Sequence, residues 1–253
     1  MFRVVIPARY ASTRLPGKPL RLIAGRPMIE HVYERARASG AAEVIVATDD
    51  ERIASACARF GADVALTDPG HPSGTDRLAE VARQRRFAAD DVVVNVQGDE
   101  PLLAPASVAE VAELLATLPE AAIATLATPI THLDEYLDPN VVKVVRDARG
   151  RALYFSRAPI PWQRDAAAAG AAGAGRYAGA LRHIGLYAYR AGALARLAAL
   201  PPSRLETAER LEQLRALENG LVILVGIASA PPGPGVDTEA DLARVAALVA
   251  VRG

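Results

Sequence analysis

The segment Ile6–Leu20, IPARYASTRLPGKPL, combines side chains that could bind a polyphosphate. It carries Arg9, Arg14 and Lys18 directly after an apolar run typical of a first strand. Arginine can bind phosphate oxygens bidentately, and proline can hold the shape of such a loop. The segment is not a Walker A loop, because its Gly-Lys pair is followed by proline, and it lacks the GxGxxG pattern. On charge alone, a solvated basic loop is an equal alternative.

A carboxylate follows a second apolar run, VVVNVQGDEPLL, which spans Val92–Leu103. Asp99 therefore falls just beyond a predicted buried strand, where open α/β sheets bind ligands. It would suit Mg²⁺, because magnesium takes one or two carboxylates together with substrate phosphate oxygens. The alternative is a loop aspartate that caps the helix predicted near Pro105. Gln97, an amide at the same strand end, favours the functional interpretation.

Asp237 in GVDTEADL could supply a second carboxylate to such a site. Thr238 and Asp241 have the spacing of a capping box at the start of a helix, which leaves Asp237 free. A divalent ion at a phosphoryl-transfer site needs a second carboxylate of this kind. Spacing alone does not pair Asp237 with Asp99, and an ordinary loop residue is the alternative.

Ser73, Gly74 and Thr75 in HPSGTDRLAE mark the start of another predicted helix. Free backbone amides at a helix start can accept an anion or the edge of a base. Plain N-capping by Ser73 explains the same residues equally well. The residues alone do not distinguish these two roles.

Two further pairs of polar residues lie in the second half of the chain. His183 and Tyr187 are four apart in RHIGLYAYR, so both lie on one face of a predicted strand. A lone histidine beside apolar residues is more often a satisfied core group than a ligand or base. Glu212 and Gln213 lie on the polar side of a leucine-striped helix, where a solvated face is the default interpretation.

The elements that must position these residues alternate between strands and helices through the first half of the chain. Apolar runs without alternation are typical of parallel strands covered on both faces. Strands that alternate with helices favour a doubly wound α/β sheet with right-handed crossovers. The predicted strands are RVVIP, EVIVATDD, ADVAL and DVVVNV, and the predicted helices are MIEHVYERARAS, ERIASACARF and TDRLAEVARQRR.

The middle of the chain changes character. Strand-like segments separated by turn signals predict a largely antiparallel insertion at about residues 121–190, where partner subunits often meet: IATLATPI, NVVKVVRD and RALYFSRAPIPW. Arg164–Ala180 is rich in alanine and glycine and predicts a mobile excursion. After the strand RHIGLYAYR, the pattern predicts one helix over residues 203–220, a strand over 221–228 and a closing helix over 238–251. All of these elements fit a single domain, residues 1–253.

Composition limits the classes of function. The 253 residues are 51% hydrophobic and carry a formal net charge of zero, so no global field favours nucleic acid or an anionic membrane. The single cysteine, Cys57, excludes an internal disulfide and a cysteine zinc cluster, and its helical context predicts a buried core thiol. No apolar run is long enough for a signal peptide or a membrane span, and we expect a cytoplasmic protein.

Taken together, the motifs resemble one family, the 3-deoxy-manno-octulosonate cytidylyltransferases or CMP-Kdo synthetases. The resembling segments run in order over residues 6 to 242: IPARYASTRLPGKPL, IVATDD, HPSGTDRLAEV, VNVQGDEP, PNVVKVVRD, ALYFSRAPIPW, RHIGLYAYR, LEQLR and GVDTEADL. The resemblance implies a Rossmann-like, glycosyltransferase-A-type nucleotidyltransferase fold and a homodimer. The implied reaction couples CTP and the sugar acid Kdo to CMP-Kdo and pyrophosphate, which activates the sugar for lipopolysaccharide biosynthesis.

The resemblance also implies roles for individual residues. Those that would bind the nucleotide are Ala8, Arg9, Ser12, Arg14, Lys18, Ser73, Arg77 and Gln97. Those that would hold the sugar are Arg157, His183, Tyr187, Glu212 and Gln213. The implied Mg²⁺ ligands are Asp99 and Asp237, and the implied catalytic residues are Arg9, Lys18, Asp99 and Asp237.

Three alternatives stay open from the sequence. A cytidylyltransferase for another acidic sugar, such as sialic acid, shares the chemistry, although the sugar-side segments FSRAPIPW and RHIGLYAY favour Kdo. A nicotinamide-dependent dehydrogenase is disfavoured by the missing GxGxxG pattern. A non-catalytic nucleotide-binding regulator is disfavoured because both Asp99 and Asp237 are present.

Overall fold

The computed structural model describes residues 1–11, 14–165 and 177–252. Ser12 lies outside this range, as do residues 166–176 of the predicted excursion. Within the described residues, no helix is both long enough and apolar enough to cross a membrane.

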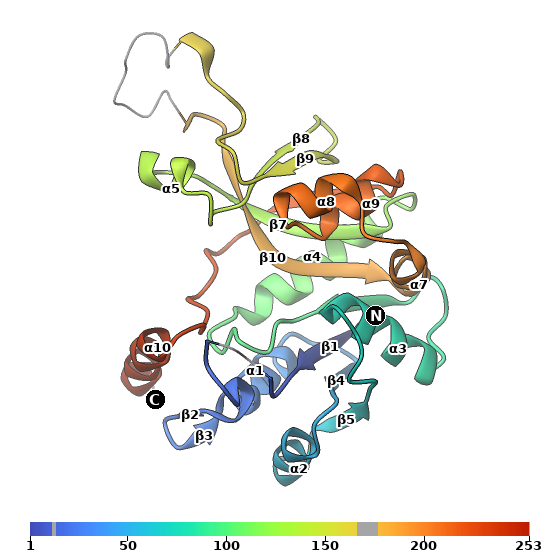
Figure 1. Cartoon of the computed structure of the whole chain (residues 1–253), viewed down its shortest axis with the longest axis vertical. Coiled ribbons are helices and arrows are strands. Elements are labelled where there is room, and N and C mark those ends of the chain that lie inside the picture. Colours follow the sequence, from blue (N-terminus) through green and yellow to red (C-terminus); the bar gives the residue numbers. More distant parts are fainter. Residues whose placement is uncertain (12–13, 166–176, 253) are drawn as a thin grey trace.

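The central sheet has the strand order β11-β7-β10-β6-β1-β4-β5 (Figure 1). Its strands are β1 (Phe2–Ala8), β4 (Glu43–Thr48), β5 (Asp63–Leu66), β6 (Val92–Asn95), β7 (Ile123–Pro129), β10 (Leu181–Arg190) and β11 (Ile223–Ile227). β1 pairs in parallel with β4 and β6, and β7 pairs in parallel with β11. β10 runs antiparallel to both of its neighbours. The mostly parallel α/β sheet predicted from the apolar runs is therefore confirmed.

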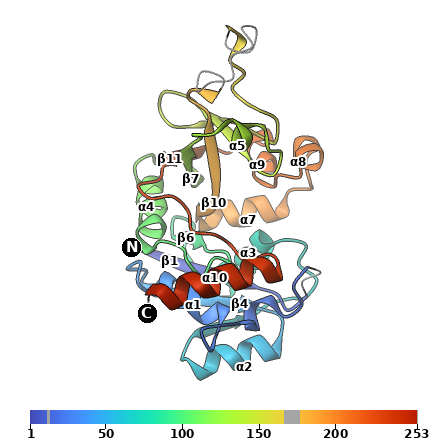
Figure 2. The same ribbon diagram turned by 90° about the vertical axis from the view of Figure 1, so that its left-hand side faces the viewer.

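Each face of the sheet carries its own hydrophobic core, which explains why the strands are apolar without alternation. Successive residues of β1 point to opposite faces, so that Val4 and Ile6 join one core and Val5 joins the other. The first face is covered by α1 (Met28–Arg37), α2 (Glu51–Arg59) and α4 (Pro105–Ala116). The second is covered by α3 (Gly74–Gln84) and by α7 (Ala191–Ala199), with α8 (Arg204–Glu209) and α9 (Gln213–Glu218). Figure 2 shows α4 on one side of β10 and α7 to α9 on the other.

The strands of residues 121–190 pair antiparallel with one another, as predicted, but they do not all form a separate insertion. β7 and β10 belong to the central sheet, and β8 (Lys143–Arg146) and β9 (Ala152–Ser156) form an extension attached to the start of β10. The prediction placed IATLATPI in the insertion, but this segment is β7 of the central sheet. The short helix α5 (Leu133–Leu137) lies between β7 and β8. The error arose because turn signals around a strand do not reveal its partners.

The single helix predicted over residues 203–220 is also wrong, because the chain forms α8 and α9 with a break between them. Arg210 ends α8 in the left-handed conformation, with φ 55°. This conformation interrupts the helix and turns the chain so that Glu212 and Gln213 start α9. Gly220 follows the end of α9 with φ 71°, as the sequence predicted.

The C-terminal helix α10 (Glu239–Arg252) packs beside the N-terminal hairpin of β2 (Leu22–Ile23) and β3 (Arg26–Pro27) (Figure 1). A separate small core joins Leu15 and Ile23 to Leu242 and Val245. Arg21 strengthens this contact with two hydrogen bonds to the Glu239 carboxylate, of 2.6 and 2.8 Å. The packing brings Asp237 and the first basic loop together from opposite ends of the sequence.

Candidate active site

A cleft of about 350 Å³, here called the main cleft, opens at the carboxyl ends of β1 and β6. β1 and β6 are neighbours in the sheet, so their end loops lie side by side. Residues predicted to bind nucleotide or metal line it together: Ala8, Arg9, Arg14, Lys18, Gln97 and Asp99. This is the position at which open α/β sheets bind ligands.

Glycines shape both loops of the main cleft. Gly17 has φ 65°, and its amide donates a hydrogen bond of 3.2 Å to the Tyr10 carbonyl, which folds the basic segment back on itself. The 3-10 helix η1 (Lys18–Leu20) follows this turn directly. A Cβ on Gly98 would lie 2.9 Å from the Pro7 carbonyl oxygen, so only glycine lets the two loops approach this closely.

Lys18 joins the two aspartates that the resemblance assigns to metal. Its Nζ donates hydrogen bonds of 2.7 Å to Asp99 and 2.9 Å to Asp237, and one of 2.9 Å to the Val236 carbonyl. Burial acts to lower the pKa of Lys18, but the hydrogen bonds to the two carboxylates outweigh it and the pKa lies above its ordinary value. Lys18 is therefore a cation at neutral pH.

The two carboxylates suit a divalent cation in chemistry and placement. Both reach the same ammonium group, so Asp99 and Asp237 can approach one cation from two sides. Each side chain keeps part of its surface exposed, 35% for Asp99 and 48% for Asp237. Two carboxylates with room for substrate oxygens are the ligand set that Mg²⁺ prefers. Within the described residues, no cluster of three or more His, Cys, Asp or Glu offers a larger site.

The capping alternatives are resolved by the local geometry. The Thr238 hydroxyl accepts a hydrogen bond from the Asp241 amide, and the Asp241 carboxylate accepts one from the Thr238 amide, which is the capping box that leaves Asp237 free. Asp99 does not cap α4, whose N-cap residue is Ala104. Ser73 caps α3 through a capping box with Asp76.

The predicted phosphate-binding arginines differ in their surroundings. Arg9 lines the main cleft, and its Nη2 is buried with no hydrogen-bond partner among the described residues. An anionic ligand in the cleft would supply that partner. Arg14 is mostly exposed and donates a 3.1 Å hydrogen bond to Asp237. Arg77 instead is fully buried, contacts Asp49 at 3.3 Å, donates to Thr67 and does not line the cleft.

A second cavity of about 80 Å³, here called the inner pocket, adjoins the main cleft because Gln97 lines both. Three predicted sugar-binding residues meet there: Tyr187, Glu212 and Gln213. Thr75, from the helix start that the sequence marked as a possible anion or base site, also lines the pocket. Sequence reasoning missed two other polar residues there: Asn95 and Tyr189. The signal available for Asn95 was a polar residue that ends an apolar strand.

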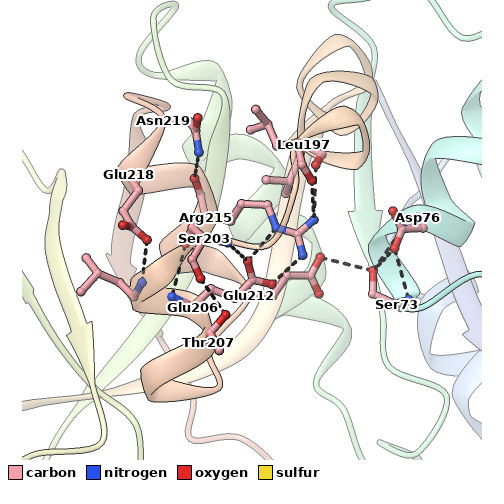
Figure 3. Close-up of polar contacts among 12 residues, drawn as sticks. Ser73, Asp76, Leu197, Ser203, Glu206, Thr207, Glu212, Arg215, Glu218 and Asn219 are labelled. Carbon is pink, nitrogen blue, oxygen red and sulfur yellow. Dashed lines mark hydrogen bonds and ion pairs between the residues drawn. The ribbon is translucent and has the colours of Figure 1, made fainter.

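Glu212 precedes α9 and contacts the start of α3 (Figure 3). The Ser73 hydroxyl donates a hydrogen bond of 3.4 Å to Glu212 from the other side of the pocket, and Thr75 also hydrogen-bonds this carboxylate. Burial raises the pKa of Glu212 above its ordinary value. Behind it, Arg215 forms hydrogen bonds of 2.5 and 2.8 Å with Glu206, which ties α8 to α9.

Two predicted sugar-binding residues do not line the inner pocket. The His183 ring packs on Tyr187 with 5.3 Å between centroids, and its Nε2 lies 3.0 Å from the Thr125 hydroxyl. Burial lowers the pKa of His183 to about 3, so the imidazole is neutral at neutral pH. Arg157 donates through Nε and Nη1 to the carbonyls of Glu209 and Pro139, at 2.7 and 2.9 Å. His183 therefore contacts the pocket through Tyr187, and Arg157 ties the segment after β9 to the end of α8.

The doubly wound sheet and the cationic cleft beside Asp99 and Asp237 suit a nucleotidyltransferase, and comparison with known proteins gives the class. The profile of the family described as Cytidylyltransferase matches residues 3–223. A cytidylyltransferase from Leptospira borgpetersenii shares the fold, with a TM-score of 0.63 at 15% identity over 98% of this chain and 86% of that one.

Closer relatives specify the family. The 3-deoxy-manno-octulosonate cytidylyltransferase of Halorhodospira halophila is 59% identical over 97% of this chain and 95% of its own, and that of Marinobacter nauticus is 58% identical over 98% and 97%. A solved CMP:2-keto-3-deoxy-manno-octonic acid synthetase complexed with CTP superposes with a TM-score of 0.89 at 46% identity over both whole chains. The chain belongs to the 3-deoxy-manno-octulosonate cytidylyltransferase family, and the dehydrogenase alternative is wrong.

Proposed function

We propose that this chain transfers the cytidylyl group of CTP to 3-deoxy-manno-octulosonate and releases pyrophosphate. The observation that carries the proposal is the junction at Gln97, where a cationic cleft meets a small polar pocket. Asp99 lines the cleft, and Asp237 borders it through Lys18. This arrangement suits a nucleoside triphosphate held next to a hydroxylated acid. The relatives that share most of the sequence are named for the same reaction.

In the proposed mechanism, the main cleft binds and orients the triphosphate. Arg9 meets a phosphate oxygen with the buried Nη2 that has no described partner, and Lys18 and Arg14 face the pyrophosphate that leaves. Cations fixed where charge develops stabilise the transition state. Ala8 and Gln97 at the strand ends hold the cytidine.

The reaction itself is an in-line displacement. The anomeric hydroxyl oxygen of the sugar forms a bond to the α-phosphorus while the bond from that phosphorus to the pyrophosphate oxygen breaks. Such a transfer depends on positioning, which the adjoining cleft and pocket supply. None of the four histidines, all within the described residues, lines either cavity, so no imidazole base is at hand.

We further propose that Asp99 and Asp237 hold Mg²⁺, because both reach one cation and stay partly exposed. When bound, the ion neutralises phosphoryl charge and lowers the pKa of the attacking hydroxyl. The aspartates contribute their negative charge and their orientation. Lys18, which contacts both aspartates and lines the cleft, contributes its positive charge beside the phosphates.

Sugar choice is tested by incubating the protein with CTP, Mg²⁺ and either 3-deoxy-manno-octulosonate or sialic acid. We expect pyrophosphate release with the first sugar and a rate at least about a hundredfold lower with the second, since buried polar groups of the inner pocket would lose partners. Pyrophosphate release with sialic acid alone would assign the chain to that other acidic sugar.

We also propose a homodimer formed through the predicted dimerisation region, about residues 121–190. Three large apolar side chains of this region are strongly exposed: Leu137 at 44%, Leu153 at 63% and Trp162 at 57%. Replacing Leu153 with glutamate is expected to convert a dimer into a monomer in sedimentation velocity, because a charge in an apolar interface has no partner. Leu66→Glu, at an exposed leucine outside the region, is the matched control. A monomeric wild type would contradict the proposal.

The cytoplasmic location stays a prediction.

A further inference from the structure

Asn95 ends β6, and its side chain lines the inner pocket. The residue is only 3% exposed, and its Oδ1 has no hydrogen-bond partner among the described residues. Buried carbonyl oxygens are nearly always hydrogen-bonded, because an unpaired buried acceptor destabilises the fold. A donor from outside the described chain is therefore expected at this oxygen.

Several polar neighbours of Asn95 hydrogen-bond one another. Thr75 hydrogen-bonds both the Tyr189 hydroxyl and the Glu212 carboxylate. Glu212 receives a further hydrogen bond from Ser73. Among the described residues that line the pocket, the Asn95 oxygen is the buried side-chain atom without a partner, so it is an acceptor open to a ligand.

The shape of the inner pocket limits what can reach Asn95. Its volume of about 80 Å³ is more than a single water needs, and it is much smaller than the main cleft of about 350 Å³. The stacked rings of Tyr187 and Tyr189, with 5.8 Å between centroids, give it an apolar side. Carbons that carry hydroxyl groups fit such a pocket, which joins these ring faces to the polar side chains of Asn95, Gln97 and Glu212.

The position of Asn95 also indicates which part of the substrate it meets. Gln97, at the junction with the main cleft, comes two residues later, which at the rise of an extended chain is about 7 Å. The reacting hydroxyl must lie at that junction, next to the α-phosphorus. A group at Asn95 is therefore several bonds away from the reacting carbon.

We propose that Asn95 is a specificity-determining residue whose carboxamide oxygen accepts a hydrogen bond from a hydroxyl on the tail of the sugar acid. The proposal rests on the proposed function, which places the sugar in the inner pocket. Asn95 selects sugars that carry a hydroxyl group at that position, and it leaves the binding of CTP unchanged.

Steady-state kinetics of three variants test this role. Asn95→Leu keeps the branching of the side chain but removes its polar atoms, and Asn95→Thr keeps one oxygen. We expect KM for the sugar to rise at least about tenfold in Asn95→Leu and less in Asn95→Thr, with KM for CTP within about twofold of wild type. Thr48→Val is the matched control, since Thr48 is a buried polar residue that ends β4 and lines neither cavity. It should leave both KM values unchanged.

Sugar analogues that each lack one hydroxyl group complete the experiment. For one analogue, the kcat/KM of wild type should be at least about tenfold lower than for the full sugar. For the same analogue, the kcat/KM of Asn95→Leu should equal its value for the full sugar. An unchanged sugar KM in Asn95→Leu, or equal increases in both KM values together with a lower Tm, would overturn the proposal. Wild type that forms no CMP-sugar would instead refute the proposed function, so the two failures are distinguishable.

Discussion

Replacing Asp99 with asparagine is expected to lower kcat about 10³-fold or more while the protein stays folded. The change removes one of the two negative charges proposed to hold Mg²⁺, and metal stabilisation of a phosphoryl transition state is worth several kcal/mol. Asp237→Asn should have a comparable effect, because both carboxylates reach the same cation position. The measurement is pyrophosphate release at saturating CTP and sugar over a range of Mg²⁺ concentrations.

The fold should survive these substitutions because both carboxylates lie at the rim of the cleft. Asp99 and Asp237 keep exposed surface, and asparagine retains their size and one acceptor oxygen. CTP should still raise the Tm of both variants, since Arg9 and Lys18 are unchanged. A lost thermal shift would place the aspartates in nucleotide binding rather than in the chemical step.

Glu239→Gln is the matched control for the metal proposal. Glu239 is a carboxylate two residues beyond Asp237, but it pairs with Arg21 on the outer surface. The Glu239→Gln variant should keep kcat within about twofold of wild type, because an exposed ion pair contributes little to stability. If both aspartate variants also kept kcat within about fivefold of wild type, the metal role of the two carboxylates would be refuted.

Strand-forming segments could be predicted from the sequence, but partners far apart in the chain could not. The apolar runs of β1, β4 and β6 are a direct consequence of burial on both faces. The pairing of Asp99 with Asp237 has no local signal, because it depends on α10 packing against the N-terminal hairpin. Leu15 and Val245, which make this contact, look like ordinary apolar residues in the sequence.

Residue type indicated which side chains could bind an anion, but it did not indicate which of them are buried against other protein groups. The resemblance gave Arg157 and Arg77 the role of ligands, yet their guanidinium groups bind protein oxygens at Glu209 and Asp49. Charge in a sequence does not show whether a side chain faces substrate or ties two elements together. Asn95 shows the converse, since a polar residue inside a valine run gives no sign that its oxygen is unpartnered.

Replacing Arg215 with methionine is expected to lower the free energy of unfolding by about 2–3 kcal/mol, because it leaves the half-buried Glu206 carboxylate without its partner. The side chains of this pair are 10% and 14% exposed, and two hydrogen bonds join them (Figure 3). Arg215 also reaches the Leu197 carbonyl at the end of α7. Urea unfolding measures the loss, and Arg21→Met, which breaks an exposed pair, should cost less than about 1 kcal/mol.

Arg215→Met should also weaken the binding of the sugar and leave the binding of CTP unaffected. Glu212 begins α9, and Arg215 holds that helix against α8, so its loss lets Glu212 move relative to Ser73. KM for the sugar should rise several-fold, while KM for CTP, whose cleft lies on the other side of Gln97, should stay near wild type. The double variant Glu206→Met and Arg215→Met removes both charges and should recover most of the stability. Recovery of stability without recovery of the sugar KM would show that the ion pair also sets the position of Glu212. If the Arg215→Met protein were as stable as wild type, the claim that the Glu206 carboxylate needs Arg215 as its partner would be wrong.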